Sequence, residues 1–210
     1  MKIIDMERRK SDLVFTVKPD WVSWKDVMGC FSHAHEVNNE KGLVMPSQFM
    51  TPEELEEDMK DGTCFVALKD QKVVGTASVK IIQRKQWWNI GKKVGYLCHA
   101  GIIKEYQGSI VFYTLYKMRD KFVKENGLAI SQLHTAEYND TVIKLNKMRG
   151  YKLVQYAPTG KDAKYYSVTL ARWENGCPYP DWFVKVMYYL SMVIAKAFFT
   201  SEYKFRFWFH

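Results

Sequence analysis

The chain has 210 residues, of which 47% are hydrophobic and 15% aromatic, and its formal net charge is +8. This length can enclose a substantial hydrophobic core, and the apolar content excludes an intrinsically disordered chain. The excess of lysine and arginine favours an anionic partner: a polyphosphate cofactor, an anionic membrane surface or a nucleic acid. The basic residues are scattered and no RRM-, KH- or zinc-finger-type signature is present, so we expect no nucleic-acid partner.

The four cysteines lie far apart in the sequence and form no C-x-x-C pair. We therefore expect no metal site and no disulfide framework, but reduced thiols in a cytoplasmic protein. The first residues, MKIIDMER, lack the apolar segment of a signal peptide, and no uncharged run is long enough to span a bilayer.

Two helices are predicted in the N-terminal quarter, after a short strand over residues 13–17. The first begins at Ser23, with Asp26 three residues further on. The second begins at Thr51, which is followed by a proline and by a glutamate at the position that completes a capping box. Residues 35–50 between the helices contain glycine and proline and are expected to form a loop over a substrate site.

Three strands should follow, over residues 63–68, 73–82 and 94–103. Gly75 inside the second strand indicates a bulge or a close backbone approach. The third strand leads through the turn EYQGS into a helix over residues 109–126. Such a junction directs unpaired backbone N–H groups and the positive end of a helix dipole at one point, which suits a phosphate group.

The remaining pattern predicts a strand over residues 128–135, a short helix that begins at Asn139 or Asp140, and two final strands over 151–156 and 165–171. The order β-α-α-β-β-β-α-β-α-β-β favours an α/β (α+β) fold. In this fold, a mostly antiparallel sheet of six to seven strands is flanked by helices and contains one parallel crossover.

Two segments of this pattern are similar to family motifs. Residues 103–109, IKEYQGS, resemble the segment V-x-P-E-Y-R-G-x, which leads into the pyrophosphate loop Q/R-x-x-G-x-G/A. Residues 139–151, NDTVIKLNKMRGY, resemble N-x-x-A-x-x-L-Y-x-x-x-G-F and agree at Asn139, Leu145, Gly150 and Tyr151. On these motifs, residues 1–171 are identified as a domain that resembles the GNAT superfamily of acyl-CoA-dependent N-acyltransferases.

The resemblance implies an N-acetyltransferase that moves an acetyl group from acetyl-CoA to a primary amine of a small molecule or peptide. It also implies a set of residues that contact the cofactor: Gly101, Ile102 and Ile103 for the pantetheine arm, Gln107, Gly108, Ser109, Ile110 and Val111 for the pyrophosphate, and Asn139.

Two departures from the family pattern support an alternative, a non-catalytic GNAT-fold binding module. Ile110 and Phe112 occupy the positions of two glycines that let the backbone approach a phosphate. If their side chains obstruct the cofactor, replacing both with glycine should strengthen CoA binding. Asn146 stands where many members carry a tyrosine that protonates the departing thiolate. A carboxamide cannot be that acid, although it can donate a hydrogen bond.

Three residues are candidates for the base that deprotonates the amine. His99 on the central strand titrates in the right range, but a histidine satisfied by a neighbouring carbonyl also explains it. His134 and Glu137 follow at the end of the next strand, where a surface position also explains them. We place Asn146 with these three as the catalytic candidates.

Residues 172–210 form an amphipathic and aromatic extension beyond the family pattern. Apolar side chains in this segment recur at helical spacing, at Phe183, Val186, Met187, Leu190, Val193, Ile194, Ala197 and Phe198. The stripe predicts either a helix that packs on the domain or on a second copy in a homodimer, or a helix that lies on an anionic membrane surface through residues 180–210.

Overall fold

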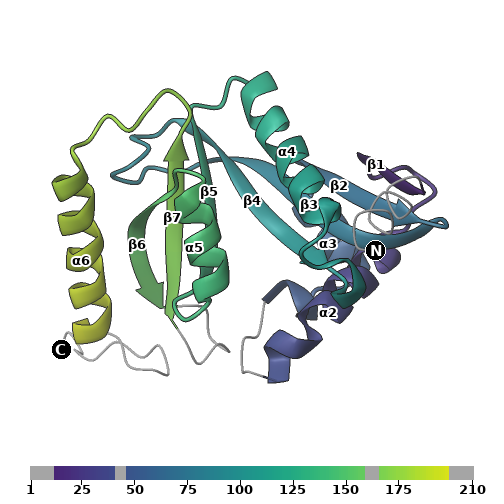
Figure 1. Cartoon of the computed structure of the whole chain (residues 1–210). Coiled ribbons are helices and arrows are strands. Elements are labelled where there is room, and N and C mark those ends of the chain that lie inside the picture. Colours follow the sequence, from purple (N-terminus) through teal and green to yellow (C-terminus); the bar gives the residue numbers. More distant parts are fainter. Residues whose placement is uncertain (1–11, 41–45, 159–165, 199–210) are drawn as a thin grey trace, which may run out of the picture. The chain divides into compact units, whose positions relative to one another are not determined.

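The structure is a computed structural model that describes residues 12–40, 46–158 and 166–198 (Figure 1). Its elements are β1 (Leu13–Val17), α2 (Trp24–Glu40), the 3-10 turn η1 (Pro46–Phe49), α3 (Pro52–Asp58), β2 (Gly62–Lys69), β3 (Lys72–Gln83), β4 (Lys93–Ile102), the 3-10 turn η2 (Lys104–Tyr106), α4 (Ile110–Glu125), β5 (Ile130–Ala136), α5 (Asp140–Met148), β6 (Lys152–Pro158), β7 (Tyr166–Trp173) and α6 (Asp181–Phe198). This order confirms the predicted one. The predictions for the N-terminal residues, for parts of the two long loops and for the chain end after Phe198 lie outside the described residues.

The strands form one seven-stranded sheet in the order β1-β2-β3-β4-β5-β7-β6. The pairs β1–β2, β2–β3, β5–β7 and β6–β7 are antiparallel, so the predicted mixed α/β fold with a mostly antiparallel sheet is confirmed. The chain divides into two compact units. Unit 1 comprises Met1–Ile81 with Leu97–Asn126, and unit 2 comprises Ile82–Tyr96 with Gly127–His210.

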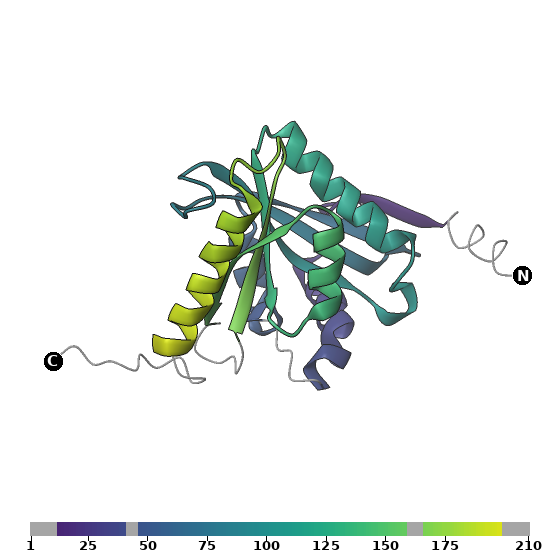
Figure 2. The ribbon, with the colours of Figure 1, turned by 60° about the vertical axis from the view of Figure 1, so that its left-hand side comes forward.

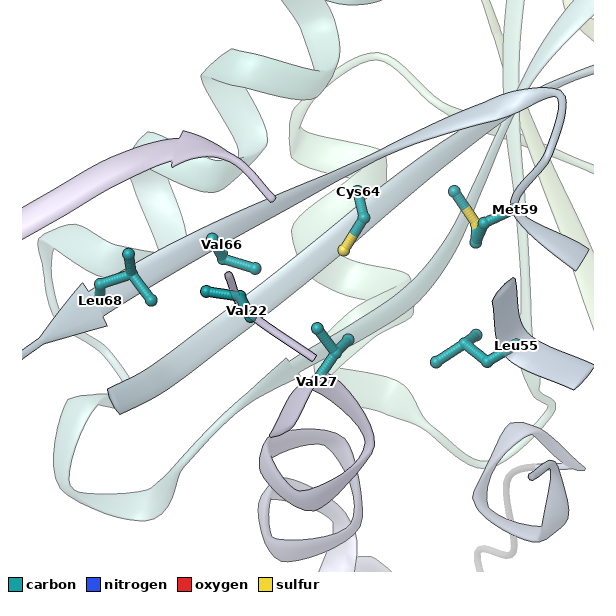
Figure 3. Packing of buried hydrophobic residues seen from close by; sticks show 7 residues of the cluster. All are labelled: Val22, Val27, Leu55, Met59, Cys64, Val66 and Leu68. Atoms are coloured by element: carbon teal, nitrogen blue, oxygen red, sulfur yellow. The ribbon is translucent and has the colours of Figure 1, made fainter. Parts of the chain in front are cut away.

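In unit 1, strand β2 is buried on both faces because its side chains alternate between two layers of helices. Cys64, Val66 and Leu68 point into a core built with residues of α2, α3 and the turn before α2 (Figure 3). Phe65, on the other face, contacts Phe122 of α4 with 6.3 Å between the ring centroids. The layers on both faces make β2 the centre of this unit.

The two predicted helix starts in this unit are confirmed by their hydrogen bonds. The Ser23 hydroxyl donates to Asp26 Oδ2 at 2.6 Å and accepts from the Asp26 N–H at 3.1 Å. Thr51 forms a complete capping box with Glu54 ahead of α3. These caps satisfy N–H groups that the helices themselves cannot bond.

Gly75 accounts for the way β3 meets α4. The register passes from Ala67 opposite Gly75 to Leu68 opposite Val73, so β3 contains one extra residue and forms a bulge. A Cβ atom on Gly75 would lie 2.7 Å from Val111 Cγ1. The predicted bulge and the predicted close approach are therefore both present.

In unit 2, the residues before β4 are held by tryptophan hydrogen bonds. Trp88 Nε1 donates to Gln132 Oε1 at 3.0 Å, and Trp173 Nε1 donates to the Trp88 carbonyl at 3.1 Å. The Tyr179 hydroxyl donates to the Trp87 carbonyl at 3.0 Å. The turn before β4 thus belongs to the core of this unit.

Helix α6 packs alongside β6 in unit 2, as Figures 1 and 2 both show. Val184 and Ala195 are buried in this contact, and the Ser191 hydroxyl accepts a hydrogen bond from the Tyr156 N–H at 2.9 Å. The packing face is therefore not centred on the predicted stripe, because Val186, Leu190, Val193 and Ile194 are exposed. Within the described parts of the chain, no helix is long and apolar enough to cross a membrane.

Candidate active site

In unit 1, a turn after β4 leads into the N-terminus of α4, where the sequence predicts a phosphate-binding site. Gly108 adopts a left-handed conformation (φ +69°), which favours glycine. The space next to its Cα is open, because a Cβ atom there would have no neighbour within 4 Å. Ser109 is the N-cap of α4, and its hydroxyl accepts a hydrogen bond from the Val111 N–H at 3.2 Å. The next N–H groups at the helix start have no partner inside the helix. Backbone donors and a positive dipole end are thus available for an anion.

Ile110 and Phe112, at the two glycine positions of the family loop, are half-buried in the first turn of α4. The Phe112 ring contacts the Tyr116 ring one turn further along, with 4.2 Å between the centroids. Lys117 lies over Tyr113, and Lys121 pairs with Glu125, so these two lysines belong to the outer surface of the helix.

The three residues predicted to hold the pantetheine arm are the last two of β4 and Ile103, which follows it. Gly101 is buried against α2, where a Cβ would lie 3.1 Å from Ala34 Cβ. The Ile103 N–H donates to the Val74 carbonyl at 3.1 Å, and the Ile102 carbonyl accepts from Gln107 Nε2 at 3.0 Å. Both backbone groups are engaged inside unit 1, and the predicted cofactor contacts of these residues remain predictions.

His99 lies on β4 in an unusual setting. Its backbone is left-handed (φ +43°), a conformation that costs a residue other than glycine about 1–2 kcal/mol. Its side chain is only 8% exposed, and Nε2 lies 2.8 Å from Asp58 Oδ2. Lys80 Nζ donates to both oxygens of Asp58, at 2.6 and 2.7 Å. A histidine, a carboxylate and an ammonium group thus form one chain of hydrogen bonds.

This arrangement fixes which nitrogen of His99 carries the proton. Burial raises the pKa of Asp58, but the hydrogen bonds from Lys80 and His99 outweigh it, and the pKa is lowered overall. An ionised carboxylate only accepts, so Nε2 must donate. In the neutral ring, the lone pair is then on Nδ1, which is buried and has no hydrogen-bond partner among the described residues. Burial lowers the pKa of His99, although Asp58 acts in the opposite direction.

A neighbouring histidine has the purely structural role considered for His99. His35 is buried on α2, and its Nε2 donates to the Ala100 carbonyl at 2.9 Å. Burial lowers the pKa of His35. The partner of His99 is a carboxylate instead, and this hydrogen bond fixes the orientation of the ring.

In unit 2, His134 and Glu137 lie near the end of β5. The His134 Nδ1 is 3.2 Å from Thr169 Oγ1, and the ring contacts Tyr96 edge-on. Desolvation by the surrounding protein, with the charge of Arg84, lowers the pKa of His134 to about 4. The ring is therefore neutral at pH 7, although part of the side chain is exposed. The Glu137 carboxylate accepts a hydrogen bond from the Tyr156 hydroxyl.

The second family-like segment forms α5 and its two ends. Asn139 caps the helix: Oδ1 accepts from the Val142 N–H at 3.4 Å and Nδ2 donates to Thr135 Oγ1 at 3.0 Å. Gly150 ends the helix in a left-handed conformation (φ +84°), and Tyr151 is buried after it. The motif residues therefore have structural roles: Asn139 begins α5, Gly150 ends it and Tyr151 packs in the core.

Asn146 lies on the buried face of α5. Its Nδ2 donates to the Val142 carbonyl at 2.8 Å, while its Oδ1 is buried and has no partner among the described residues. One amide hydrogen is left for another acceptor. A role for Asn146 toward a thiolate remains a prediction.

Asp58 and Lys80 are the two residues of this site that the sequence did not indicate. Asp58 ends the acidic helix PEELEED, a composition typical of a solvated surface, and lies 41 residues from His99 in the chain. Among the described residues, no group of three or more histidine, cysteine, aspartate or glutamate side chains is arranged to hold a metal ion.

The profile of the Acetyltransferase (GNAT) family matches residues 32–151, more than half of the chain. The chain therefore belongs to the GNAT family, as its motifs predict. No curated protein sequence matches it.

Solved structures with the same fold are acetyltransferases of low sequence identity. A probable acetyltransferase from Staphylococcus epidermidis is 13% identical, with a TM-score of 0.61 and coverage of 77% of this chain and 99% of that one. A ribosomal-protein-alanine N-acetyltransferase from Brucella melitensis is 11% identical, with a TM-score of 0.58 and coverage of 76% and 99%. NAA60 from Arabidopsis thaliana, in complex with acetyl-CoA, is 13% identical, with a TM-score of 0.56 and coverage of 78% and 99%. At these identities the likeness establishes the fold.

Proposed function

We propose that this chain is a cytoplasmic N-acetyltransferase that transfers an acetyl group from acetyl-CoA to a primary amine of a small molecule or peptide. The observation that carries the proposal is the start of α4, where the left-handed Gly108 and the N-cap Ser109 precede the first helical N–H groups, which have no partner inside the helix. Such a helix start suits the pyrophosphate of CoA. The GNAT neighbour solved with acetyl-CoA supports the same cosubstrate.

In the proposed reaction, His99 accepts the proton of the amine at Nδ1. Asp58 is a positioning residue, because it accepts from Nε2–H and stabilises the imidazolium that forms. Nδ1 is buried, so the amine or a water molecule has to gain access to it when substrate binds. The thioester of acetyl-CoA supplies the activated acyl group. A thiol pKa of about 8.5 lets the thiolate leave without a strong acid, which is consistent with Asn146 at the tyrosine position.

The first test is isothermal titration of the full chain with acetyl-CoA. Saturable binding is expected, and no binding at millimolar ligand would exclude the enzyme. The second test follows thiol release with a panel of primary amines and N-terminal peptides. His99→Gln should abolish turnover and leave acetyl-CoA affinity unchanged, whereas His134→Gln and Glu137→Gln should retain turnover. Loss of turnover in Glu137→Gln alone would indicate that Glu137, and not His99, accepts the proton of the amine.

The second candidate function is a GNAT-fold module that binds an acyl-CoA or CoA without turnover. The observation that favours it is the pair Ile110 and Phe112, which puts side chains where the family loop has glycines. Binding of acetyl-CoA without thiol release for any amine of the panel would support this candidate.

A further inference from the structure

The outer face of α6 exposes a row of large apolar side chains. The row consists of Trp182, Val186, Tyr189, Leu190, Val193 and Ile194, each between 45% and 66% exposed. Their spacing of three and four residues places them on one side of the helix, and we call them the α6 stripe. Single exposed apolar residues are common, but a contiguous row marks a surface that binds something.

The opposite face of α6 is already occupied. Val184 and Ala195 are buried against unit 2, and Ser191 bonds to the backbone of β6. The helix is therefore anchored, and the α6 stripe can contact a partner without any rearrangement of the fold.

The charges on α6 favour a negatively charged partner. Lys185 lies three residues after Trp182 and borders the α6 stripe. Lys196 lies three residues after Val193, and its Nζ is 5.4 Å from the centroid of the Tyr156 ring of β6. The helix has one acidic residue, Asp181, which pairs with Lys152. A second copy packed antiparallel on the stripe would bring Lys185 toward the other copy's Lys196, and the one carboxylate of α6, Asp181, is already paired with Lys152.

The sequence continues this composition beyond α6. Residues 199–210, FTSEYKFRFWFH, contain six aromatic residues, together with Lys204 and Arg206 and a single acidic residue. Tryptophan, tyrosine and phenylalanine next to lysine and arginine are the residues that favour the boundary between lipid headgroups and acyl chains.

We propose that the α6 stripe lies on an anionic membrane surface, with Trp182 and Tyr189 among the headgroups, the aliphatic side chains at the acyl boundary and Lys185 and Lys196 paired with lipid phosphates. The contact is in the plane of the surface, since the described helices include none that could span a bilayer. The site is independent of the acetyl-transfer chemistry.

Flotation of the full chain with vesicles tests the proposal. Binding to phosphatidylcholine vesicles containing about a third phosphatidylserine should exceed binding to pure phosphatidylcholine roughly tenfold and fall with salt. Val186→Thr with Leu190→Gln and Val193→Thr should weaken binding at least tenfold. The matched control, Val14→Thr with Val17→Thr and Met148→Gln, changes apolar residues elsewhere that are each more than half exposed, and it should bind like the wild type. Unfolding curves establish that both variants fold.

A pair of charge variants tests the lysines. Lys185→Gln with Lys196→Gln should lower binding several-fold and flatten its salt dependence, whereas Lys144→Gln with Lys147→Gln, on α5, should change neither. The proposal is overturned by equal binding to both vesicle types, or by equal losses in the stripe variant and its control. It is also overturned if the wild type does not float and sediments as a dimer without lipid, while the stripe variant sediments as a monomer. The stripe is then an interface between two copies of the chain.

Discussion

His99 is the side chain on which the proposed proton transfer depends, and three neighbouring influences set its pKa. Burial lowers it, the Asp58 carboxylate raises it, and the Lys80 ammonium group lowers it. We expect an NMR titration to place the pKa of His99 below the ordinary 6.5. Asp58→Asn should lower it further, because the hydrogen-bonded negative charge is lost. Lys80→Met should raise it, because a positive charge is lost while Asp58 stays.

A second lysine–aspartate pair in the same unit provides the control. Lys69 Nζ donates to Asp12 Oδ2 at 2.7 Å. Asp12→Asn and Lys69→Met remove the same groups as the two variants above, and the pKa of His99 should stay at its wild-type value in both. An unchanged or raised pKa in Asp58→Asn would mean that the Asp58–His99 hydrogen bond does not form in solution.

The sequence predicts one of the three residues of this cluster, and chain separation explains why it does not predict the other two. His99 is found because it lies on the strand that leads into the phosphate-type turn. Asp58 and Lys80 are brought to it by the packing of α3 and β3, and neither stands in a motif that refers to His99. Contacts of this kind depend on the tertiary structure, and periodicity and capping carry no information about them.

Local patterns predict the boundaries of helices and strands better than the faces they bury. The caps at Ser23, Thr51 and Asn139 need only three or four consecutive residues, and all three are present in the structure. Helix α6 is apolar on two sides, so its periodicity could not determine which side packs on β6. The stripe that the sequence emphasises is largely the exposed one, and the buried side is marked by Val184 and Ala195.

The contact between β3 and α4 can be tested with a pair of glycines. Gly75→Ala should destabilise the protein by about 1–3 kcal/mol, because the new Cβ would meet Val111 at 2.7 Å and Leu115 at 3.1 Å. Gly29→Ala, in the middle of α2, has nothing within 4 Å of the new Cβ and should stabilise by roughly 0.5–1 kcal/mol. Urea unfolding measures both. A Gly75→Ala variant as stable as the wild type would mean that β3 and α4 are further apart than described.

Among the described residues, the histidines whose pKa is shifted all favour the neutral ring, in both units. Burial lowers the pKa of His35 and His99 in unit 1, and desolvation by the surrounding protein lowers the pKa of His134 in unit 2. The unfolded chain therefore binds more protons than the folded one between the ordinary pKa of 6.5 and the lower folded values. Stability must then rise with pH in this window and fall as the solution is acidified. The lowered pKa of Asp58 acts only below the ordinary carboxyl pKa of 3.8, outside this window.

Urea unfolding at steps from pH 7.5 to pH 4.5 measures this dependence. The free energy of unfolding should be constant above pH 7 and should decrease progressively below pH 6.5. His35→Gln keeps a side-chain N–H donor near the Ala100 carbonyl and removes one titrating group, so its curve should be shallower than that of the wild type. If the wild-type curve is flat between pH 7 and pH 5, the histidines have the same pKa in the folded and the unfolded chain. The burial described for the His99–Asp58 pair would then be wrong.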